Sequence, residues 1–321
     1  MGEFELIRTV FAAAPCAQGG DGIALGIGDD CALLSVPFGE QLAISTDTLV
    51  SAVHFADPCD PFLLGQRSLA VAASDLAAMG ATPLAFTLAL TLPTVDADWL
   101  HAYARGLNQM AHTCNLRLIG GDTTRGPLSL TLTVFGRVPT GAALTRSGAQ
   151  PGDVLCVGGE LGNAAGALAL VLGQHISDPL IAQTLLGHYW SPQPQLALGQ
   201  ALRGKATSAL DISDGLLADC GHIAQASQVG LLIENDRVPI SSALQVFLGD
   251  AQARQAALTG GDDYVLAFTL PERELPALLA DGWPIHLIGR VVEGHGVTLV
   301  DAEGEDITPT IRGYQHFRAK P

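Results

Sequence analysis

The sequence predicts a two-domain protein of the α/β (α+β) class, with strands and helices mixed in each half. The chain has 321 residues, enough for about two domains. Its residues are 48% hydrophobic and only 15% charged, so each half can bury a core. A segment rich in glycine and proline, residues 140–152, lies between the halves. We therefore expect an amino-terminal domain over residues 1–140 and a carboxyl-terminal domain over residues 141–321.

The first half is expected to contain a mixed sheet and long helices. Apolar periodicity predicts helices at residues 5–14, 61–79 and 98–115, and strands at residues 41–47, 85–92, 116–120 and 128–138. Alternation of Leu and Val with Ser and Thr in the last strand is typical of an antiparallel sheet. Such a sheet has one covered face and a second face available for a partner.

The second half repeats the mixture of strands and helices without a repeated sequence. The expected strands are residues 154–157, 208–212, 231–234, 264–269, 286–291 and 297–300. The expected helices are residues 159–172, 216–227, 241–247 and 272–279. This half is expected to form an α/β domain.

Six segments place an aspartate beside Gly, Ser or Thr at the edge of an apolar run. They are Gly28-Asp29-Asp30, Ser45-Thr46-Asp47, Ser74-Asp75, Gly120-Gly121-Asp122, Asp211-Ile212-Ser213-Asp214-Gly215 and Gly260-Gly261-Asp262-Asp263. Carboxylate and hydroxyl oxygens are the ligands that Mg²⁺ prefers. One such segment alone is as well explained by a solvated acidic turn. Six of them favour a site for several metal ions gathered at strand ends.

Asp75 is distinctive because it interrupts a helix rich in alanine and leucine. Its side chain is expected to point into the protein, where a bare charge would cost several kcal/mol. A metal ion or an ion pair would offset that cost. His54, in a turn-like segment seven residues after Asp47, is a further candidate site residue. Arg146, in a glycine-rich loop, is a candidate phosphate ligand. A plain surface arginine is the alternative for Arg146.

Net charge and cysteine usage restrict the partners. Acidic residues outnumber basic ones 32 to 16, giving a net charge of −16, which argues against nucleic acid or an anionic membrane as partner. The six cysteines form no CxxC pair, and the first five residues lack the basic residues of a signal peptide. The apolar runs are too short to span a bilayer. We expect a cytoplasmic protein with reduced thiols.

In this order, the motifs resemble those of the thiamine-monophosphate kinase family of the aminoimidazole-ribonucleotide-synthetase-like superfamily. The segments that carry the resemblance are residues 26–34, 43–50, 74–81, 118–127, 144–149 and 211–216. The resemblance implies two α/β domains and a homodimer joined through the sheets of the amino-terminal domains. It also implies transfer of the γ-phosphoryl group of ATP to thiamine phosphate, giving ADP and thiamine diphosphate, with several Mg²⁺ ions.

The resemblance also assigns roles to individual residues. The implied metal ligands are Asp30, Ser45, Thr46, Asp47, Asp75, Asp122, Asp211 and Asp214. The implied ATP contacts are Gly121, Asp122, Arg146 and Ser213, and the implied thiamine-phosphate contacts are His54, Asp262 and Tyr314. The chain departs from the family at two positions. The family often has Glu at Asp262, and many relatives have a tyrosine near adenine at Ala104, where the nearest aromatic residue here is Tyr103.

The implied chemistry requires no side-chain base and no covalent nucleophile. The acceptor phosphate is already anionic at neutral pH, since its second pKa is about 6. Catalysis is then expected to consist of positioning and charge compensation by metal ions. Two alternatives stay open: another ATP-dependent synthetase or kinase of the superfamily, and a non-catalytic protein that binds cations or nucleotides.

Overall fold

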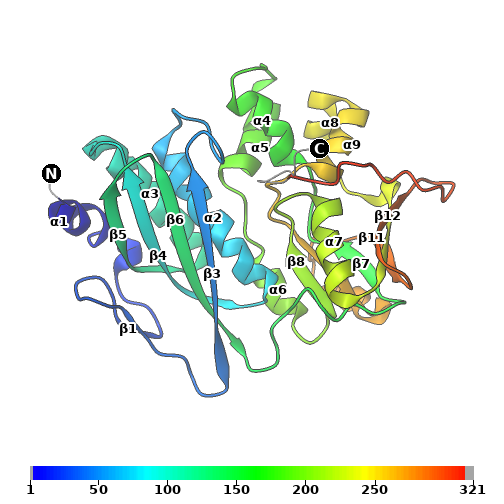
Figure 1. Ribbon diagram of the computed structural model, residues 1–321, viewed down its shortest axis with the longest axis horizontal. Helices are drawn as coiled ribbons and strands as arrows, with labels where there is room; N and C mark the ends of the chain where they lie inside the picture. Colours follow the sequence, from blue (N-terminus) through cyan, green and yellow to red (C-terminus); the bar gives the residue numbers. More distant parts are fainter. Residues whose placement is uncertain (1–2, 315–321) are drawn as a thin grey trace. The chain divides into compact units, whose positions relative to one another are not determined.

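A four-stranded sheet organises the amino-terminal part of the computed structural model, which describes residues 3–314 (Figure 1). The chain divides into unit 1, Met1–Leu76 with Ala81–Ala143, and unit 2, Ala77–Gly80 with Leu144–Pro321. The strands of unit 1 are β1 (Ile23–Leu25), β2 (Leu33–Leu34), β3 (Glu40–Val50), β4 (Thr82–Leu92), β5 (Arg117–Arg125) and β6 (Ser129–Pro139). Its helical segments are α1 (Glu3–Leu6), η1 (Ile7–Phe11), η2 (Pro15–Ala17), α2 (Pro61–Ala78) and α3 (Ala97–Cys114).

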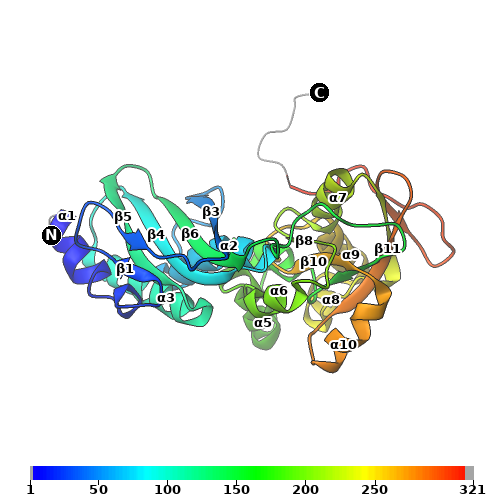
Figure 2. The same ribbon diagram turned by 90° about the horizontal axis from the view of Figure 1, so that it is seen from below.

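The large sheet of unit 1 has the strand order β3-β6-β4-β5. β3 and β4 each pair antiparallel with β6, while β4 and β5 run parallel. Helices α2 and α3 lie along one face, as Figures 1 and 2 show. Alternate residues of β6, such as Leu132 and Val134, are fully buried on this covered face. The other face, called the open face below, carries partly exposed side chains.

Three expectations for unit 1 are wrong in detail. Strand β3 does not end at Asp47 but continues to Val50, because it pairs with β6 over its whole length. Strand β5 likewise continues through Asp122, because β4 pairs with it as far as Arg125. The sheet itself is mixed, as expected. The helix expected over residues 5–14 is replaced by α1 and a π-helical turn, η1.

The second unit contains a six-stranded sheet with helices. Its strands are β7 (Val154–Val157), β8 (Ser208–Asp211), β9 (Gly230–Glu234), β10 (Leu266–Leu270), β11 (His286–Val292) and β12 (Gly296–Val300). Its helices are α4 (Asn163–Val171), α5 (Pro179–Trp190), α6 (Leu196–Leu202), α7 (Leu216–Ser227), α8 (Ser242–Leu248), α9 (Asp250–Thr259) and α10 (Leu275–Ala280), with short turns η3 (Asn235–Arg237) and η4 (Glu272–Glu274).

The sheet of unit 2 has the order β12-β9-β11-β7-β10-β8. All neighbours are antiparallel except β12 and β9. Strands β7, β8 and β10 are buried along their whole length, and β7 is accordingly apolar at every position. Helices α5 and α9 were not expected, and α4 begins at Asn163 rather than at residue 159.

Two apolar clusters stabilise this sheet. One contains Leu210, Ile212, Leu216 and Ile223, which join β8 to α7. The other contains Phe268 of β10 and Leu198 of α6. The turn between β8 and α7 is therefore fixed at both ends by buried side chains. Among the described helices of the whole chain, none is both long and apolar enough to cross a membrane.

Candidate functional site

Strand β3 distributes the candidate ligands Ser45, Thr46 and Asp47 over two faces of the sheet. Successive side chains of a strand point to opposite faces. The hydroxyl of Thr46 lies 2.9 Å from that of Thr133, which belongs to the open face. Ser45 and Asp47 alternate with Thr46 and therefore lie on the face covered by α2 and α3. The expected grouping of all three at a strand end is wrong, because they lie in the interior of β3.

Ser45 contacts Asp75 on the covered face. The hydroxyl of Ser45 donates a hydrogen bond to Oδ2 of Asp75, which belongs to α2. Asp75 is only partly exposed, and its neighbours Ser74 and Leu76 are buried, so its carboxylate points towards the sheet as expected. Ser45, Asp47 and Asp75 thus provide oxygen atoms on one side of the sheet.

Asp122 lies on the open face. In the paired strands it is opposite Ala89 of β4, which in turn is opposite Thr131 of β6. Thr131 bonds Thr48 at 2.9 Å on the open face, so Asp122 shares a row with these residues. Asp122 is exposed. The structure therefore groups Asp122 with Thr46 rather than with Asp75.

Gly121 is fixed by the close approach of β4. A side chain there would place its Cβ 1.9 Å from the backbone oxygen of Leu88, well inside van der Waals contact. The backbone of Gly121 is exposed on its other side. A glycine is required by packing at this position, and its open backbone leaves room for a ligand.

The loop after β3 holds His54 in one orientation. The backbone N–H of Val50 donates a 3.0 Å hydrogen bond to Nδ1 of His54. An accepting Nδ1 carries no proton, so the neutral ring presents N–H at Nε2. The buried Arg67 donates through Nη2 to the backbone oxygen of His54 at 3.4 Å.

Asp30 lies in an exposed turn between β1 and β2, and its N–H donates to Oδ1 of Asp29 at 2.9 Å.

In unit 2 the candidate residues gather around the turn that follows β8. Asp211 is the last residue of β8 and is 8% exposed, while Ser213 is exposed and Asp214 is half-buried. The backbone N–H of Asp262 donates to the oxygen of Ser213 at 2.9 Å. The N–H of Tyr314 donates to the oxygen of Asp214, also at 2.9 Å. The structure thus brings four residues implied for metal, ATP and thiamine phosphate onto one hydrogen-bonded turn.

Asp262 is held in a strained conformation. Its φ is 71°, and that of Tyr264 is 52°, both in the left-handed region that favours glycine. The hydroxyl of Tyr264 donates to Oδ1 of Asp262 at 2.9 Å. Such strain persists where surrounding bonds over-determine the backbone, which is common at ligand sites. The bond also orients the Asp262 carboxylate, which is one methylene shorter than the glutamate frequent in the family.

Sequence reasoning missed Asp219. This buried carboxylate in the first turn of α7 accepts three backbone hydrogen bonds through Oδ2, from Ser213 at 3.0 Å, Asp214 at 2.9 Å and Gly215 at 3.1 Å. Burial, and to a smaller extent the negative charge of Asp214, raise the pKa of Asp219 to about 6, although the backbone donors act in the opposite direction. The sequence does contain one signal for this role: Asp219 is an acidic residue in the first turn of the helix that follows Gly215, where the helix dipole favours a negative charge.

Asp263 was proposed only as part of the motif Gly260–Asp263. Both of its oxygens accept the backbone N–H of Gly162 at 2.9 Å, just before α4. Desolvation raises the pKa of Asp263 well above its ordinary value, and the charges of Asp262 and Asp219 act in the same direction. Its carboxylate thereby joins the loop to the start of α4, whereas the Asp262 carboxylate accepts from the hydroxyl of Tyr264.

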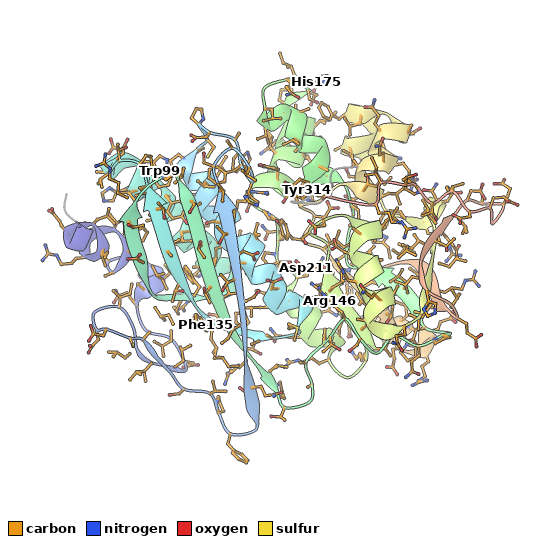
Figure 3. All side chains as sticks on the ribbon, viewed as in Figure 1. Trp99, Phe135, Arg146, His175, Asp211 and Tyr314 are labelled. Atoms are coloured by element: carbon orange, nitrogen blue, oxygen red, sulfur yellow. The ribbon has the colours of Figure 1, made fainter. Side chains whose placement is uncertain are left out.

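Arg146 lies exposed in the loop that precedes β7. Its backbone oxygen accepts a 3.1 Å hydrogen bond from the hydroxyl of Ser227, which also accepts the N–H groups of Gly148 and Ala149 at 3.1 Å each. The loop is thereby fixed to the end of α7, and the guanidinium remains in solvent. Figure 3 marks Arg146, Asp211 and Tyr314 within unit 2.

The candidate ligands fit Mg²⁺ better than a transition metal. Within residues 3–314, no three His, Cys, Asp or Glu side chains come together as a ready metal cage. Mg²⁺ does not require one, since it usually retains several waters and is bound by one or two carboxylates together with substrate phosphates. The donors on the covered face of unit 1 and at the β8 turn of unit 2 are carboxylate and hydroxyl oxygens, as that ion prefers.

Tyr103 is not available to contact adenine. It is fully buried, stacks on Trp99 with ring centroids 5.3 Å apart, and its hydroxyl lies 3.0 Å from that of Ser68. Burial raises the pKa of its hydroxyl. Ala104 is also buried, at 8% exposure. Neither residue replaces the tyrosine that many relatives have near adenine.

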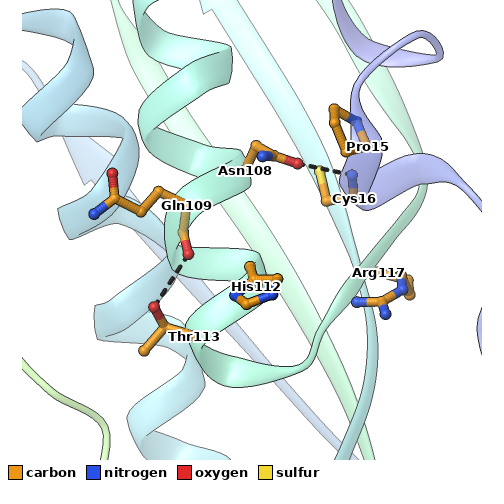
Figure 4. A pocket seen from close by; sticks show the side chains of 7 residues that line it. All are labelled: Pro15, Cys16, Asn108, Gln109, His112, Thr113 and Arg117. Carbon is orange, nitrogen blue, oxygen red and sulfur yellow. Dashed lines mark hydrogen bonds between the residues drawn. The ribbon is translucent and has the colours of Figure 1, made fainter.

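One cavity of about 590 Å³ lies apart from these residues, beside α3 (Figure 4). Its lining residues are Pro15, Cys16, Asn108, Gln109, His112, Thr113 and Arg117. None of them is a candidate ligand. Oδ1 of Asn108 accepts the backbone N–H of Cys16 at 2.8 Å, which joins η2 to α3.

Comparison with known proteins identifies the family. Residues 28–138 match the family model of the AIR synthase related protein N-terminal domain, and residues 150–302 match that of the C-terminal domain. The thiamine-monophosphate kinase of Escherichia coli K12 is 45% identical, over 98% of both chains.

Solved structures of related proteins have the same fold as this chain. The crystal structure of thiamine-monophosphate kinase from Stenotrophomonas maltophilia K279a is 45% identical, with a TM-score of 0.86, over 95% of this chain and 98% of the other. The structure of AaThiL complexed with AMPPCP and TMP is 27% identical, with a TM-score of 0.80, over 88% and 89% of the two chains. The order of motifs, the two units and these relatives together show that the chain belongs to the thiamine-monophosphate kinase family, within the AIR synthase related proteins.

Proposed function

We propose that this chain transfers the γ-phosphoryl group of ATP to thiamine phosphate, giving thiamine diphosphate and ADP. The observation that carries the proposal is the β8 turn of unit 2. There, Ser213 and Asp214 bear the backbone bonds of Asp262 and Tyr314, so residues assigned to ATP, metal and thiamine phosphate are fixed together. The full-length identity of 45% to an Escherichia coli thiamine-monophosphate kinase supports the same activity.

The proposed binding roles are those that the family resemblance implies for residues of each unit. The proposed metal ligands in unit 1 are Asp30, Ser45, Thr46, Asp47, Asp75 and Asp122. Those in unit 2 are Asp211 and Asp214. ATP phosphates are held by Arg146, by the hydroxyl of Ser213 and by the backbone of Gly121 with Asp122. The bound Mg²⁺ supplies charge compensation for two polyanions that must meet in a protein with a net charge of −16.

The acceptor is oriented by His54, Asp262 and Tyr314. The N–H at Nε2 of His54 is a donor suited to an anionic oxygen, and its orientation is fixed by Val50. The Asp262 carboxylate, directed by Tyr264, suits the cationic thiazolium of thiamine. The acceptor phosphate attacks directly, because it is already an anion and needs no base.

A substrate comparison tests the proposal. Purified protein is incubated with MgATP and either thiamine phosphate or free thiamine, and the products are separated by chromatography. Thiamine phosphate is expected to be converted to thiamine diphosphate, with free thiamine a poor acceptor. Equal rates for both would overturn the acceptor assignment. Hydrolysis or binding of ATP without conversion of either would favour another superfamily activity or a non-catalytic role.

A labelling experiment tests direct transfer. Incubation with γ-labelled ATP in the absence of acceptor is expected to leave no label on the denatured protein. Stoichiometric label that thiamine phosphate discharges would establish a covalent intermediate instead.

The open face of the unit 1 sheet is the proposed dimer interface. Leu42 and Ile44 of β3 alternate with the covered residues and are 38% and 59% exposed. Residues 1–140 would then provide dimerisation together with metal and ATP ligands, and residues 141–321 would complete the substrate site. Sedimentation equilibrium is expected to give a dimer, and Ile44→Asp is expected to shift it towards monomer.

The acidic chain is proposed to act in the cytoplasm without nucleic acid or membrane partners.

A further inference from the structure

The turn between β8 and α7 is bonded through its N–H groups to a single carboxylate. Oδ2 of Asp219 accepts from Ser213 at 3.0 Å, from Asp214 at 2.9 Å and from Gly215 at 3.1 Å. These N–H groups precede the first helical residue, so the backbone hydrogen bonds of the helix do not use them. Asp219 is 4% exposed and belongs to α7, so the turn is tied to a packed helix.

The same turn is bonded through its carbonyl groups to the acceptor-side residues. The oxygen of Ser213 accepts the N–H of Asp262, and the oxygen of Asp214 accepts the N–H of Tyr314, each at 2.9 Å. Neither bond involves a side chain. The positions of Asp262 and Tyr314 therefore depend on where the turn lies.

Both acceptor-side segments pack directly on the turn. A Cβ at Gly261 would lie 2.4 Å from the oxygen of Ser213, and a Cβ at Gly313 would lie 2.6 Å from the oxygen of Asp214. Such distances leave no space for adjustment, because real Cβ atoms do not approach oxygen so closely. A displacement of the turn would therefore move both segments together.

We propose that Asp219 is a positioning residue that sets the ATP-side residues Ser213 and Asp214 and the acceptor-side residues Asp262 and Tyr314 relative to one another. This inference rests on the proposed function and deepens it. Asp219 acts through backbone bonds of the turn, so it needs no contact with either substrate. Its loss should weaken both substrates at once, whereas loss of a contact residue should weaken one.

Substitution at Asp219 tests this coupling. The dissociation constants for a non-hydrolysable ATP analogue with Mg²⁺ and for thiamine phosphate are measured by calorimetry, together with KM and kcat. In Asp219→Ala both dissociation constants are expected to rise about tenfold. In Asp219→Asn, which keeps an acceptor oxygen, both are expected to stay within about threefold of the parent. Ser213→Ala should weaken only the ATP analogue, and Tyr314→Ala only thiamine phosphate.

Asp153 offers a matched control in the same unit. It is 6% exposed and accepts, through Oδ2, the N–H of Gln150 at 3.0 Å and the hydroxyl of Thr207 at 2.7 Å. Asp153→Ala removes an equally buried carboxylate that does not contact the turn. It should lower the melting temperature while leaving both dissociation constants at their parental values.

The outcomes separate the possible errors. Parental affinity for both ligands in a folded Asp219→Ala protein, or loss of one ligand only, overturns the inference. If Asp219→Ala does not fold, Asp219→Glu, which displaces the carboxylate by one methylene, is measured instead; it should weaken both ligands, and parental affinity overturns the inference. If the parent itself does not bind thiamine phosphate, the proposed function fails. Amide hydrogen exchange then decides about Asp219: exchange at Ser213–Gly215 no faster in the Asp219 variant than in Asp153→Ala overturns its positioning role.

Discussion

Ser45 donates a hydrogen bond from its hydroxyl to Oδ2 of Asp75 and so joins β3 to α2. This bond determines what removal of the charge should do. In Asp75→Asn the amide oxygen can still accept the Ser45 hydroxyl, while one negative charge on the covered face is lost. In EDTA we expect its free energy of unfolding to lie within about 1 kcal/mol of that of the parent.

Addition of MgATP should produce a difference in stability between the parent and the Asp75→Asn protein. The Asp75→Asn protein should gain less stability than the parent, because ligand-linked stabilisation follows affinity, and its turnover should fall by about a hundredfold or more. Thermal melting with EDTA and with MgATP, beside an activity assay, measures both effects. Asp98→Asn, an exposed change of the same charge, is the control. A variant that melts far below the parent in EDTA would make Asp75 a structural partner rather than a metal ligand.

Arg146→Ala should raise the KM for ATP about tenfold and leave that for thiamine phosphate unchanged. The loop is held by its backbone bond to Ser227, which the substitution retains, so the fold should be preserved. Initial rates over a range of each substrate provide the measurement. Arg273→Ala, which removes another exposed arginine of unit 2, is the control. If the KM for ATP and the turnover both stay parental, Arg146 does not bind ATP.

Gly121→Ala should destabilise unit 1 by roughly 3 kcal/mol, because the new Cβ would lie 1.9 Å from the oxygen of Leu88 and push β5 away from β4. Chemical denaturation followed by circular dichroism measures the loss. At the neighbouring Gly120 a Cβ would meet only Cγ2 of Thr87, at 3.9 Å, so Gly120→Ala should change stability by less than about 1 kcal/mol. Equal costs at the two positions would contradict the close approach of Gly121 to β4.

Cys59 should react slowly with iodoacetamide although it is only partly buried. Burial raises its pKa to about 11, and the charges of Asp57 and Asp60 contribute, so at pH 8 only about one thiol in a thousand is the reactive thiolate. Below this pKa its alkylation rate should rise about tenfold per pH unit. Mass spectrometry should find the exposed Cys31 modified first.

Removal of a neighbouring charge tests the cause of that slow reaction. Asp57→Asn should lower the pKa of Cys59 and speed its alkylation at pH 8, whereas Asp98→Asn should not change it. An Asp57→Asn rate equal to that of the parent would exclude the charge of Asp57 as a cause and leave burial and the charge of Asp60.

The periodic segments of this chain were predictable, and the positions of the motifs on them were less so. The helix expected over residues 61–79 is α2, Pro61–Ala78, and the strand expected over residues 154–157 is β7. Motif residues that look like turns lie inside β3 and β5, because pairing with β6 and β4 outweighs the turn preference of Ser, Asp and Gly.

The role of Asp219 was not predictable from pattern alone. Its three bonds are made to backbone N–H groups, which any residue type except proline would supply before α7. The bonds from Asp262 and Tyr314 to the same turn link positions far apart in the chain through main-chain atoms. Such main-chain contacts do not depend on particular side chains, so they are visible only in the three-dimensional structure.

Ser45, Thr46 and Asp47 alternate between the two faces of the sheet along β3. The length of the preceding loop therefore determines which of their oxygen atoms lie beside Asp75. Deletion of one residue between β2 and β3, compensated by a slip of β3 against β6, would turn Thr46 towards α2 and Ser45 towards the open face. Every side chain would keep its identity, yet the oxygen atoms beside Asp75 would be exchanged. Point substitutions in that loop should therefore be tolerated far better than single-residue insertions or deletions.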